Sequence, residues 1–197
     1  STGHLAEPVT GETITTLRQW AADYQLAIAG SYIACEEGSV HGKPPSYYNR
    51  AFFLTPEGGA HFYDKRHLFR MGSETEHFTA GDRRLIVPYR GWNILLLVCY
   101  DLRFPVWSRN VNNEYDLLIY VANWPVPRRK AWDILLQARA MENISYVCGV
   151  NRIGMDNNRF QHSGGSVIYS PKGELLAHVP ENEEGIATAT LELTALT

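Results

Sequence analysis

The sequence predicts a domain of mixed α and β structure, in the α/β or α+β class. Three short apolar runs rich in branched residues are typical of strands buried on both faces: residues 94–98, 116–122 and 146–150. Residues 13–24 and 128–143 instead repeat their apolar side chains at helical spacing. Turn signals between strand-like runs add antiparallel hairpins. Strands that alternate with helices and hairpins indicate a layered domain built on a sheet.

Composition narrows the class of protein. The chain has 197 residues, enough for one domain with a sizeable core, and 45% of them are hydrophobic. The net charge of −3 gives no basic footprint for a nucleic acid or an anionic membrane, and no apolar run approaches the length of a membrane span. We therefore expect neither a nucleic-acid nor a membrane partner.

The cysteines and histidines bear on compartment and metal binding. Cys35, Cys99 and Cys148 are odd in number and widely spaced, which argues against a disulfide framework and for a reducing, cytoplasmic location. The seven histidines are scattered without metal-ligand spacing. We expect neither a metal nor a cofactor.

Each local pattern predicts one element. In the N-terminal half these are a polar, turn-rich segment (1–11), a helix (13–24), a buried strand (26–34), a loop (36–46), a hairpin (47–54 and 61–64, joined at Pro56-Glu57-Gly58-Gly59) and a polar loop (67–81). In the C-terminal half they are strands at 84–87 and 92–98 with a turn at 89–91, a short helix (105–112), a strand (116–122), a helix (128–143), a strand (146–150), a hairpin (166–169 and 175–178) and a half-exposed strand (186–193).

Cys99 lies where a strand ends and a helix begins. The apolar run Ile94–Val98 leads into it, and Pro105 suits the first turn of a helix. Side chains at the carboxyl edge of a sheet are where α/β folds bind ligands, and backbone N–H groups there can hold a developing anion. A cysteine beside Leu and Val is often only a small core side chain. Its position, and the cationic Lys65-Arg66-His67 cluster upstream, favour a nucleophile.

A thiol nucleophile needs a proton-transfer group, an oxyanion donor and a shaped pocket. Lys65, at the end of the expected hairpin, supplies positive charge, and the backbone N–H of Tyr100 can donate to an oxyanion. Glu74 and Glu76 lie in the following loop and could orient Lys65 or move protons. A Cys–His pair is the alternative, and it could use any of three histidines: His67, His77 and His162.

Two motifs, in this order, resemble the lysine and cysteine motifs of the nitrilase superfamily of carbon–nitrogen hydrolases: Tyr63-Asp64-Lys65-Arg66-His67-Leu68-Phe69 and Cys99-Tyr100-Asp101-Leu102-Arg103-Phe104-Pro105. Four further stretches agree: Tyr48-Asn49-Arg50, Asn123-Trp124-Pro125, Ala138-Arg139-Ala140-Met141-Glu142-Asn143 and Ser170-Pro171-Lys172-Gly173. The match covers nearly the whole chain. Within the superfamily it most resembles the omega-amidase branch, whose members hydrolyse the side-chain amide of 2-oxoglutaramate or 2-oxosuccinamate.

The resemblance implies a four-layer α-β-β-α sandwich in one domain over residues 1–197. Cys99 is then expected to attack the amide carbon and form a thioester, while Lys65 and the Tyr100 N–H stabilise the oxyanion. Glu74 matches best the second glutamate that supports the lysine, with Glu76 as the alternative. No cofactor or metal is implied. Family members pair as homodimers or larger oligomers through elements near the cysteine-bearing helix.

The chain departs from the family pattern at its N-terminus. The general-base glutamate of the family lies just upstream of a stretch that Ser1-Thr2-Gly3 resembles, so it is expected before Ser1. Glu7 and Glu12 do not match that motif. The opening strand-helix-strand and a C-terminal extension of the fold are also not found here. We therefore expect a partial chain.

Two other residues in these motifs, Arg103 and Trp124, have two alternative roles each. Arg103 could clamp a substrate carboxylate, because guanidinium matches carboxylate geometry, or it could pair with Asp101. Trp124 could wall the pocket or pack in the core. We expect Asp101 to be a structural hydrogen-bonding group, and Arg139 with Glu142 to form a buried or interfacial ion pair.

Three functions remain open from the sequence. The leading hypothesis is hydrolysis of a small carboxylate-bearing amide to acid and ammonia. The second is an N-carbamoyl amino acid hydrolase, which also releases carbon dioxide. The third is a non-catalytic scaffold that retains Lys65 and Cys99 but lacks the general base.

Overall fold

A computed structural model describes residues 2–38 and 44–196. The chain divides into two compact units, Ser1–Leu85 and Ile86–Thr197, which are described one at a time. Residues 39–43 of the expected loop, and Ser1 of the expected turn-rich segment, lie outside the described residues. None of the described helices has the length and apolar content needed to cross a membrane.

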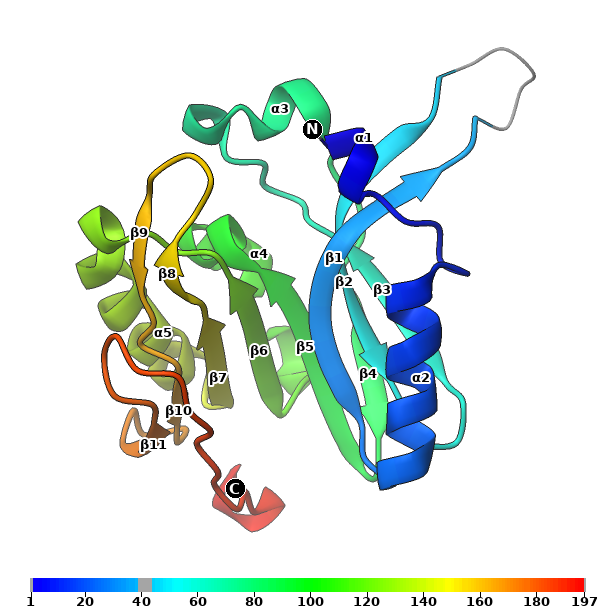
Figure 1. Cartoon of the computed structure of the whole chain (residues 1–197). Coiled ribbons are helices and arrows are strands. Elements are labelled where there is room, and N and C mark those ends of the chain that lie inside the picture. The colour runs from blue at the N-terminus through cyan, green and yellow to red at the C-terminus, as the bar shows by residue number, and fades with distance from the viewer. Residues whose placement is uncertain (1, 39–43, 197) are drawn as a thin grey trace. The chain divides into compact units, whose positions relative to one another are not determined.

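The first unit is a three-stranded antiparallel sheet with one helix packed against it (Figure 1). Its strands follow chain order: β1 (Ile28–Glu36), β2 (Ser46–Leu54) and β3 (Ala60–Asp64). The helix α2 (Glu12–Tyr24) confirms the predicted helix, and its Ile14 packs with Phe52 and Leu54 of β2. Burial of this apolar cluster is what holds α2 on the sheet.

Two details of this unit differ from the predictions. The segment expected to be turn-rich begins with a short helix, α1 (Thr2–Leu5). The strand expected to be buried, β1, is mostly half-buried. On α2, Trp20 and Tyr24 share the spacing of the buried residues but are exposed, because the stripe that meets the sheet is narrower than the run of apolar residues.

The β2–β3 hairpin confirms the predicted pairing and delivers Lys65 at its end. Arg50 pairs with Asp64, and the turn closes where Thr55 N–H donates to the Gly59 carbonyl over 2.8 Å. The following segment, expected to be a loop, contains a single turn of 3-10 helix, η1 (Arg70–Gly72), and the short helix α3 (Glu74–His77).

The second unit is built on a six-stranded mixed sheet in the order β11-β10-β7-β6-β5-β4. Its strands are β4 (Ile86–Tyr89), β5 (Trp92–Val98), β6 (Leu117–Ala122), β7 (Tyr146–Asn151), β10 (Val167–Tyr169) and β11 (Leu175–His178). The three predicted buried strands, β5, β6 and β7, are parallel neighbours, with Val98 opposite Val121 and Val121 opposite Val150. Their carboxyl ends therefore meet at one edge of the sheet.

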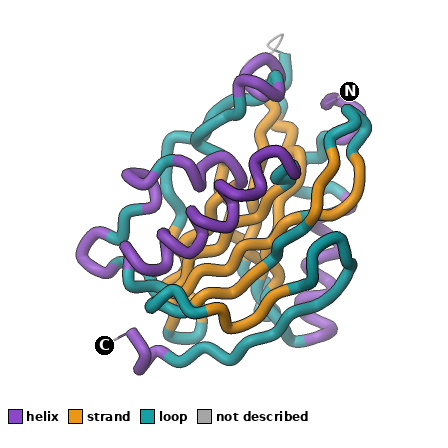
Figure 2. Tube along the Cα trace, turned by 90° about the vertical axis from the view of Figure 1, so that its left-hand side faces the viewer, coloured by secondary structure: helices purple, strands orange, loops and turns teal. Residues whose placement is uncertain are grey.

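The helix α5 (Arg129–Asn143) confirms the predicted helix over 128–143. It connects β6 to β7 and covers one face of this sheet (Figure 2). It approaches β7 closely because Gly149 has no side chain. A Cβ there would lie 2.5 Å from Leu136 Cδ1 and 3.0 Å from the Trp132 ring. The glycine thus fixes how near helix and sheet can come.

The predicted helix over 105–112 is divided in two. After the 3-10 segment η2 (Cys99–Arg103), the helix α4 (Pro105–Ser108) ends early, and a separate turn, η3 (Val111–Asn113), follows. Asn112 has a φ of 54°, in the left-handed region that no α-helix continues through.

The predicted strand over 186–193 is wrong. These residues form no ladder within the described chain, and Ile186 is 95% exposed. An alternating pattern does not by itself form a strand, because the backbone N–H and C=O groups need a neighbouring strand as partner. Here a side chain contacts the backbone instead: Tyr146 Oη donates to the Glu192 carbonyl over 3.1 Å. The hairpin of β8 (Ile153–Met155) and β9 (Gln161–Ser163) was not predicted.

The close approach of α5 and β7 generates a test. Gly149→Ala should lower the free energy of unfolding by about 1–3 kcal/mol, because the added methyl overpacks against Leu136. In a Leu136→Ala background the same change should cost less, since the obstructing atoms are gone. Urea denaturation of the four proteins measures both costs. Equal costs in the two backgrounds would show that the contact with Leu136 is not the cause.

Candidate active site

Cys99 directly follows β5 and has a φ of 45°, in the left-handed region that non-glycine residues rarely adopt. Its Sγ lies 3.9 Å from the carbonyl oxygen of Asn123, the residue that follows β6. Strained backbone of this kind costs about 1–3 kcal/mol and clusters at functional sites. The strain therefore supports, as a hypothesis, a nucleophile at the position the sequence predicts.

Tyr100, whose N–H is the predicted oxyanion donor, is the second residue of η2. Its ring meets that of Phe104 edge-on, with the ring centroids 5.3 Å apart. This contact holds the backbone next to the thiol. The oxyanion role of the Tyr100 N–H stays a prediction.

Two buried charged residues hold the segment that carries Cys99. The Asp101 carboxylate accepts a hydrogen bond from Val98 N–H over 3.1 Å, as expected of a structural group. Arg139 of α5 donates to the Leu102 carbonyl over 2.7 Å, and its second nitrogen lies 2.8 Å from a Glu142 oxygen. The predicted Arg139–Glu142 pair is confirmed, and it anchors η2 to α5.

Trp124, predicted as a pocket wall, is only 2% exposed and follows β6. Its indole Nε1 donates to the Arg128 carbonyl over 2.8 Å, and its ring lies 5.5 Å from that of Trp132. The exposed Arg103 lies over this ring, with its Cζ 5.6 Å from the ring centroid. Trp124 is thus both a core residue and a platform for Arg103, a combination that the sequence did not suggest.

In the first unit, Lys65 and Glu74 form a buried ion pair. Lys65 follows β3, its side chain is 1% exposed, and its Nζ lies 2.6 Å from Glu74 Oε2. The same oxygen accepts a hydrogen bond from Phe69 N–H over 2.7 Å. Glu76, on the same short helix, is exposed. The contact favours Glu74 over Glu76 as the partner of Lys65, while a catalytic role for either stays a prediction.

Asn49 is a supporting residue for which no role was predicted, although it lies in the stretch Tyr48-Asn49-Arg50. Its side-chain Nδ2 donates to Glu74 Oε1 over 3.3 Å, and its carbonyl accepts the Lys65 N–H over 2.9 Å. Asn49 therefore touches both members of the ion pair. The register of the predicted hairpin was the available signal, because it places Asn49 next to the strand end that carries Lys65.

Arg50 ties the same hairpin together from its other face. It donates to both oxygens of Asp64, over 2.6 and 2.9 Å, and to Glu36 over 2.6 Å. Burial lowers the pKa of the guanidinium, but the hydrogen bonds to Asp64 and Glu36 outweigh burial and leave that pKa above its ordinary value. Because Asp64 precedes Lys65, this cluster fixes the backbone from which the lysine extends.

His162 and Cys148 lie in environments typical of residues with a structural role. His162 is buried in β9, and its Nδ1 lies 3.2 Å from the Gly154 carbonyl across that hairpin. Burial raises the pKa of the Cys148 thiol to about 11, which makes it a poor nucleophile near neutral pH. All three cysteines lie in the described part of the chain, and none forms a disulfide. The described residues hold no group of three His, Cys, Asp or Glu side chains arranged to bind a metal ion.

The two glutamates offer a matched test. Glu74→Gln should lower the free energy of unfolding by about 3 kcal/mol, because it leaves the buried Lys65 ammonium without a countercharge. Glu76→Gln changes the same charge at an exposed position and should cost less than about 0.5 kcal/mol. Chemical denaturation of the two variants compares them. A larger loss from the Glu76 variant would make Glu76, not Glu74, the partner of Lys65.

Known proteins are similar to this chain in both sequence and fold. The sequence model of the carbon–nitrogen hydrolase family matches residues 2–197. Omega-amidase YafV of Escherichia coli (strain K12) is 51% identical over 170 residues, which cover 86% of this chain and 63% of that protein. The Yersinia enterocolitica omega-amidase YafV is 45% identical over 185 residues, 94% of this chain and 69% of that protein. The chain thus spans somewhat less than two thirds of the length of the E. coli relative.

A solved structure agrees with these relatives. XC1258 from Xanthomonas campestris, described as a CN-hydrolase superfamily protein, has a TM-score of 0.89 at 39% identity and covers 97% of this chain and 72% of its own. The predicted α/β class and nitrilase-type fold are confirmed, while one domain over 1–197 stays a prediction. On both sequence and structure, the chain belongs to the carbon–nitrogen hydrolase family.

Proposed function

We propose that this protein hydrolyses the amide of a small carboxylate-bearing substrate to the acid and ammonia, through a thioester on Cys99. The observation that carries the proposal is the strained Cys99 at the carboxyl end of β5, in a chain 51% identical to a protein named omega-amidase. A further relative, from Bacillus subtilis and 33% identical over 180 residues, is named 2-oxoglutaramate amidase. The proposed substrate class is therefore that of 2-oxoglutaramate and 2-oxosuccinamate.

The reaction has two half-reactions. The Cys99 thiolate attacks the amide carbon, the C–N bond of the tetrahedral intermediate breaks, and ammonia leaves with a proton. Water then adds to the thioester, the C–S bond breaks, and the acid and the thiol are released. The family resemblance assigns Lys65 and the Tyr100 N–H to the oxyanion that forms in each half-reaction. Preorganised charge at an oxyanion is the largest catalytic contribution in many acyl transfers.

Protons move in both half-reactions, and the family resemblance assigns them to a glutamate expected ahead of Ser1. Glu74 has a different role here. Its contact of 2.6 Å with Lys65 holds the lysine side chain in place. Asn49, which bonds the other oxygen of Glu74, supports the same arrangement.

A related structure contains a reactive active-site thiol. The amidase of Nesterenkonia sp. AN1 is 25% identical, with a TM-score of 0.77, and covers 92% of this chain; one of its mutants shows Michael addition of acrylamide at the active-site cysteine. This supports Cys99 as the nucleophile, because partial burial raises the pKa of the Cys148 thiol to about 11.

Ammonia release tests the proposal. The purified protein should release ammonia from 2-oxoglutaramate, and Cys99→Ala should reduce kcat by about 10⁴-fold or more, because it removes the nucleophile. Cys148→Ala is the matched control and should retain activity. Ammonia release that persists in the Cys99 variant would refute the thioester. If the protein turns over only N-carbamoyl amino acids, releasing both carbon dioxide and ammonia, it is a carbamoyl hydrolase. If it turns over no amide at all, the non-catalytic scaffold replaces the proposal.

Arg103 is the proposed carboxylate-binding residue, on the Trp124 platform. Its exposed guanidinium lies four residues past Cys99, and stacking on the indole limits its freedom, so less entropy is lost when it binds a carboxylate.

Arg103→Gln should raise KM for 2-oxoglutaramate about 10- to 100-fold, because a charged hydrogen bond is lost, and should leave KM for the neutral butyramide nearly unchanged. Steady-state kinetics with both amides measures the effect. Lys130→Gln removes an exposed cation from α5 and serves as the control. An equal loss on both amides would show that Arg103 does not read the carboxylate.

The compartment and assembly state are part of the same proposal. We place the protein in the cytoplasm, since its three thiols without a disulfide suit a reducing environment.

We also propose a homodimer. Arg109 donates to the Glu142 carbonyl over 2.7 Å and brings the ends of α4 and α5 together. Large apolar side chains are exposed there, a composition typical of an interface: Val106, Met141 and Ile144.

A further inference from the structure

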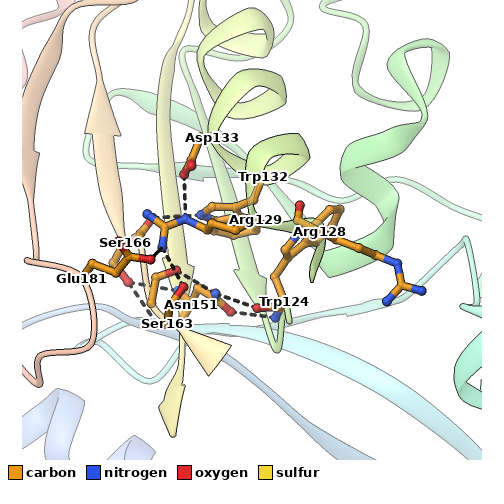
Figure 3. A network of polar contacts seen from close by, with 11 residues as sticks. Trp124, Arg128, Arg129, Trp132, Asp133, Asn151, Ser163, Ser166 and Glu181 are labelled. Carbon is orange, nitrogen blue, oxygen red and sulfur yellow. Dashed lines mark hydrogen bonds and ion pairs between the residues drawn. The ribbon is translucent and has the colours of Figure 1, made fainter. Parts of the chain in front are cut away.

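Asn151 joins three chain segments at the carboxyl edge of the large sheet. It ends β7 and is only 7% exposed. Its Oδ1 accepts the Trp124 N–H over 2.7 Å, while its Nδ2 donates to the carbonyls of Trp124, over 3.0 Å, and Gly164, over 2.7 Å (Figure 3). The side chain thus bonds both backbone groups of Trp124, as a neighbouring strand residue does, where the β6–β7 ladder ends at Ala122.

The segment that Asn151 holds carries two groups of the candidate site. The Asn123 carbonyl faces Cys99 Sγ at 3.9 Å, and the Trp124 ring supports Arg103 at 5.6 Å. A shift of residues 123–124 would therefore alter the surroundings of the thiol and the position of the guanidinium together.

We call Asn151 and the backbone groups that it bonds, those of Trp124 and Gly164, the Asn151 clamp. The Gly164 side of this clamp is fixed to α5. Trp132 donates from its indole Nε1 to the Gly165 carbonyl over 2.8 Å. Arg129 donates to Ser163 Oγ over 2.9 Å, and it packs so closely that a Cβ at Gly165 would lie 2.3 Å from its Cζ (Figure 3). Ser166 Oγ bonds both the N–H and the carbonyl of Asn151. The loop that receives the second donor is therefore rigid, and the clamp transmits that rigidity to residues 123–124.

The chemistry at this position requires an amide. One acceptor is needed for the Trp124 N–H, and two donors for the two carbonyls, a set that only Asn and Gln side chains provide. Asp keeps the acceptor but loses the donors, and buried carbonyls left without donors are costly. Gln is one methylene longer in a closely packed site.

We propose that Asn151 is a positioning residue for the amidase reaction, and that it sets the preference for carboxylate-bearing amides by holding the Asn123–Trp124 segment. This inference rests on the function proposed above. The proposed action of Asn151 runs through Trp124 and Asn123.

Asn151→Asp tests the clamp, because it keeps the size and the acceptor and removes both donors. It should lower kcat/KM for 2-oxoglutaramate about 10- to 100-fold, the scale expected when Arg103 loses a charged hydrogen bond to the carboxylate. Most of the loss should lie in KM, and butyramide should be affected much less. Asn151→Ser, which retains one donor, should be intermediate and provides a second variant if the aspartate does not fold.

Asn143→Asp is the matched control within the same unit. Asn143 is also buried, donates to the Arg139 carbonyl over 3.0 Å and accepts the Asn110 N–H over 2.9 Å. The same substitution there should cost comparable stability but leave the ratio of kcat/KM for the two amides as in the wild type.

A second readout does not depend on the substrate. The rate at which iodoacetamide modifies Cys99, followed by peptide mass spectrometry, should change severalfold in Asn151→Asp and stay unchanged in Asn143→Asp. If both variants lose activity equally on both amides, and Cys99 labelling is unaffected, Asn151 is only structural and the inference fails. If the wild type releases no ammonia, the proposed function fails, while the labelling comparison still decides whether Asn151 positions the thiol.

Discussion

The parallel register of β5, β6 and β7 is the constraint on which the second unit depends. Because Val98, Val121 and Val150 lie opposite one another, the strands end together. Cys99 and Asn123, which follow β5 and β6, and Asn151, the last residue of β7, therefore come to one edge. Buried parallel strands require helical crossovers, so α5 is a consequence of the same pairing. The polar groups beyond the strands need partners of their own, and side chains such as those of Asn151 and Asp101 provide them.

The first unit presents its functional group by a different route. Lys65 extends from the end of an antiparallel hairpin, and its ammonium is buried, so desolvation must be offset by Glu74. Asn49 and the Arg50 cluster hold the carboxylate and the backbone around it. A cation fixed in advance costs no reorganisation when charge develops on a substrate, which is the condition for electrostatic catalysis.

The sequence predicted those parts of the fold that local patterns determine. Short apolar runs located β5, β6 and β7, helical spacing located α2 and α5, and turn residues located the β2–β3 hairpin. The failures arose where tertiary neighbours decide. Residues 186–193 alternate like a strand but find no partner within the described chain, and Trp20 shares the spacing of Ile14 but faces away from the sheet.

The candidate site shows the same division. Cys99 and Lys65 were predictable because each follows a recognisable strand, whereas no role was predicted for Asn49 or Asn151. An asparagine in a strand carries no pattern of its own. Its importance depends on which backbone groups lie within about 3 Å, and that becomes visible only when the register and the neighbouring loops are known.

The left-handed conformation of Cys99 has a consequence for how this protein can change over time. Glycine adopts that conformation at no steric cost, whereas the strain at a non-glycine residue such as Cys99 costs about 1–3 kcal/mol. The greater flexibility of glycine in the unfolded chain lowers the free energy of unfolding by only about 0.5–1 kcal/mol. A laboratory selection for thermal robustness alone, with no demand for turnover, should therefore tolerate or enrich glycine at position 99. Thermal stability favours glycine at position 99, whereas the proposed catalysis requires the sulfur of cysteine there. The backbone strain therefore persists as long as the cysteine at the end of β5 is needed for activity.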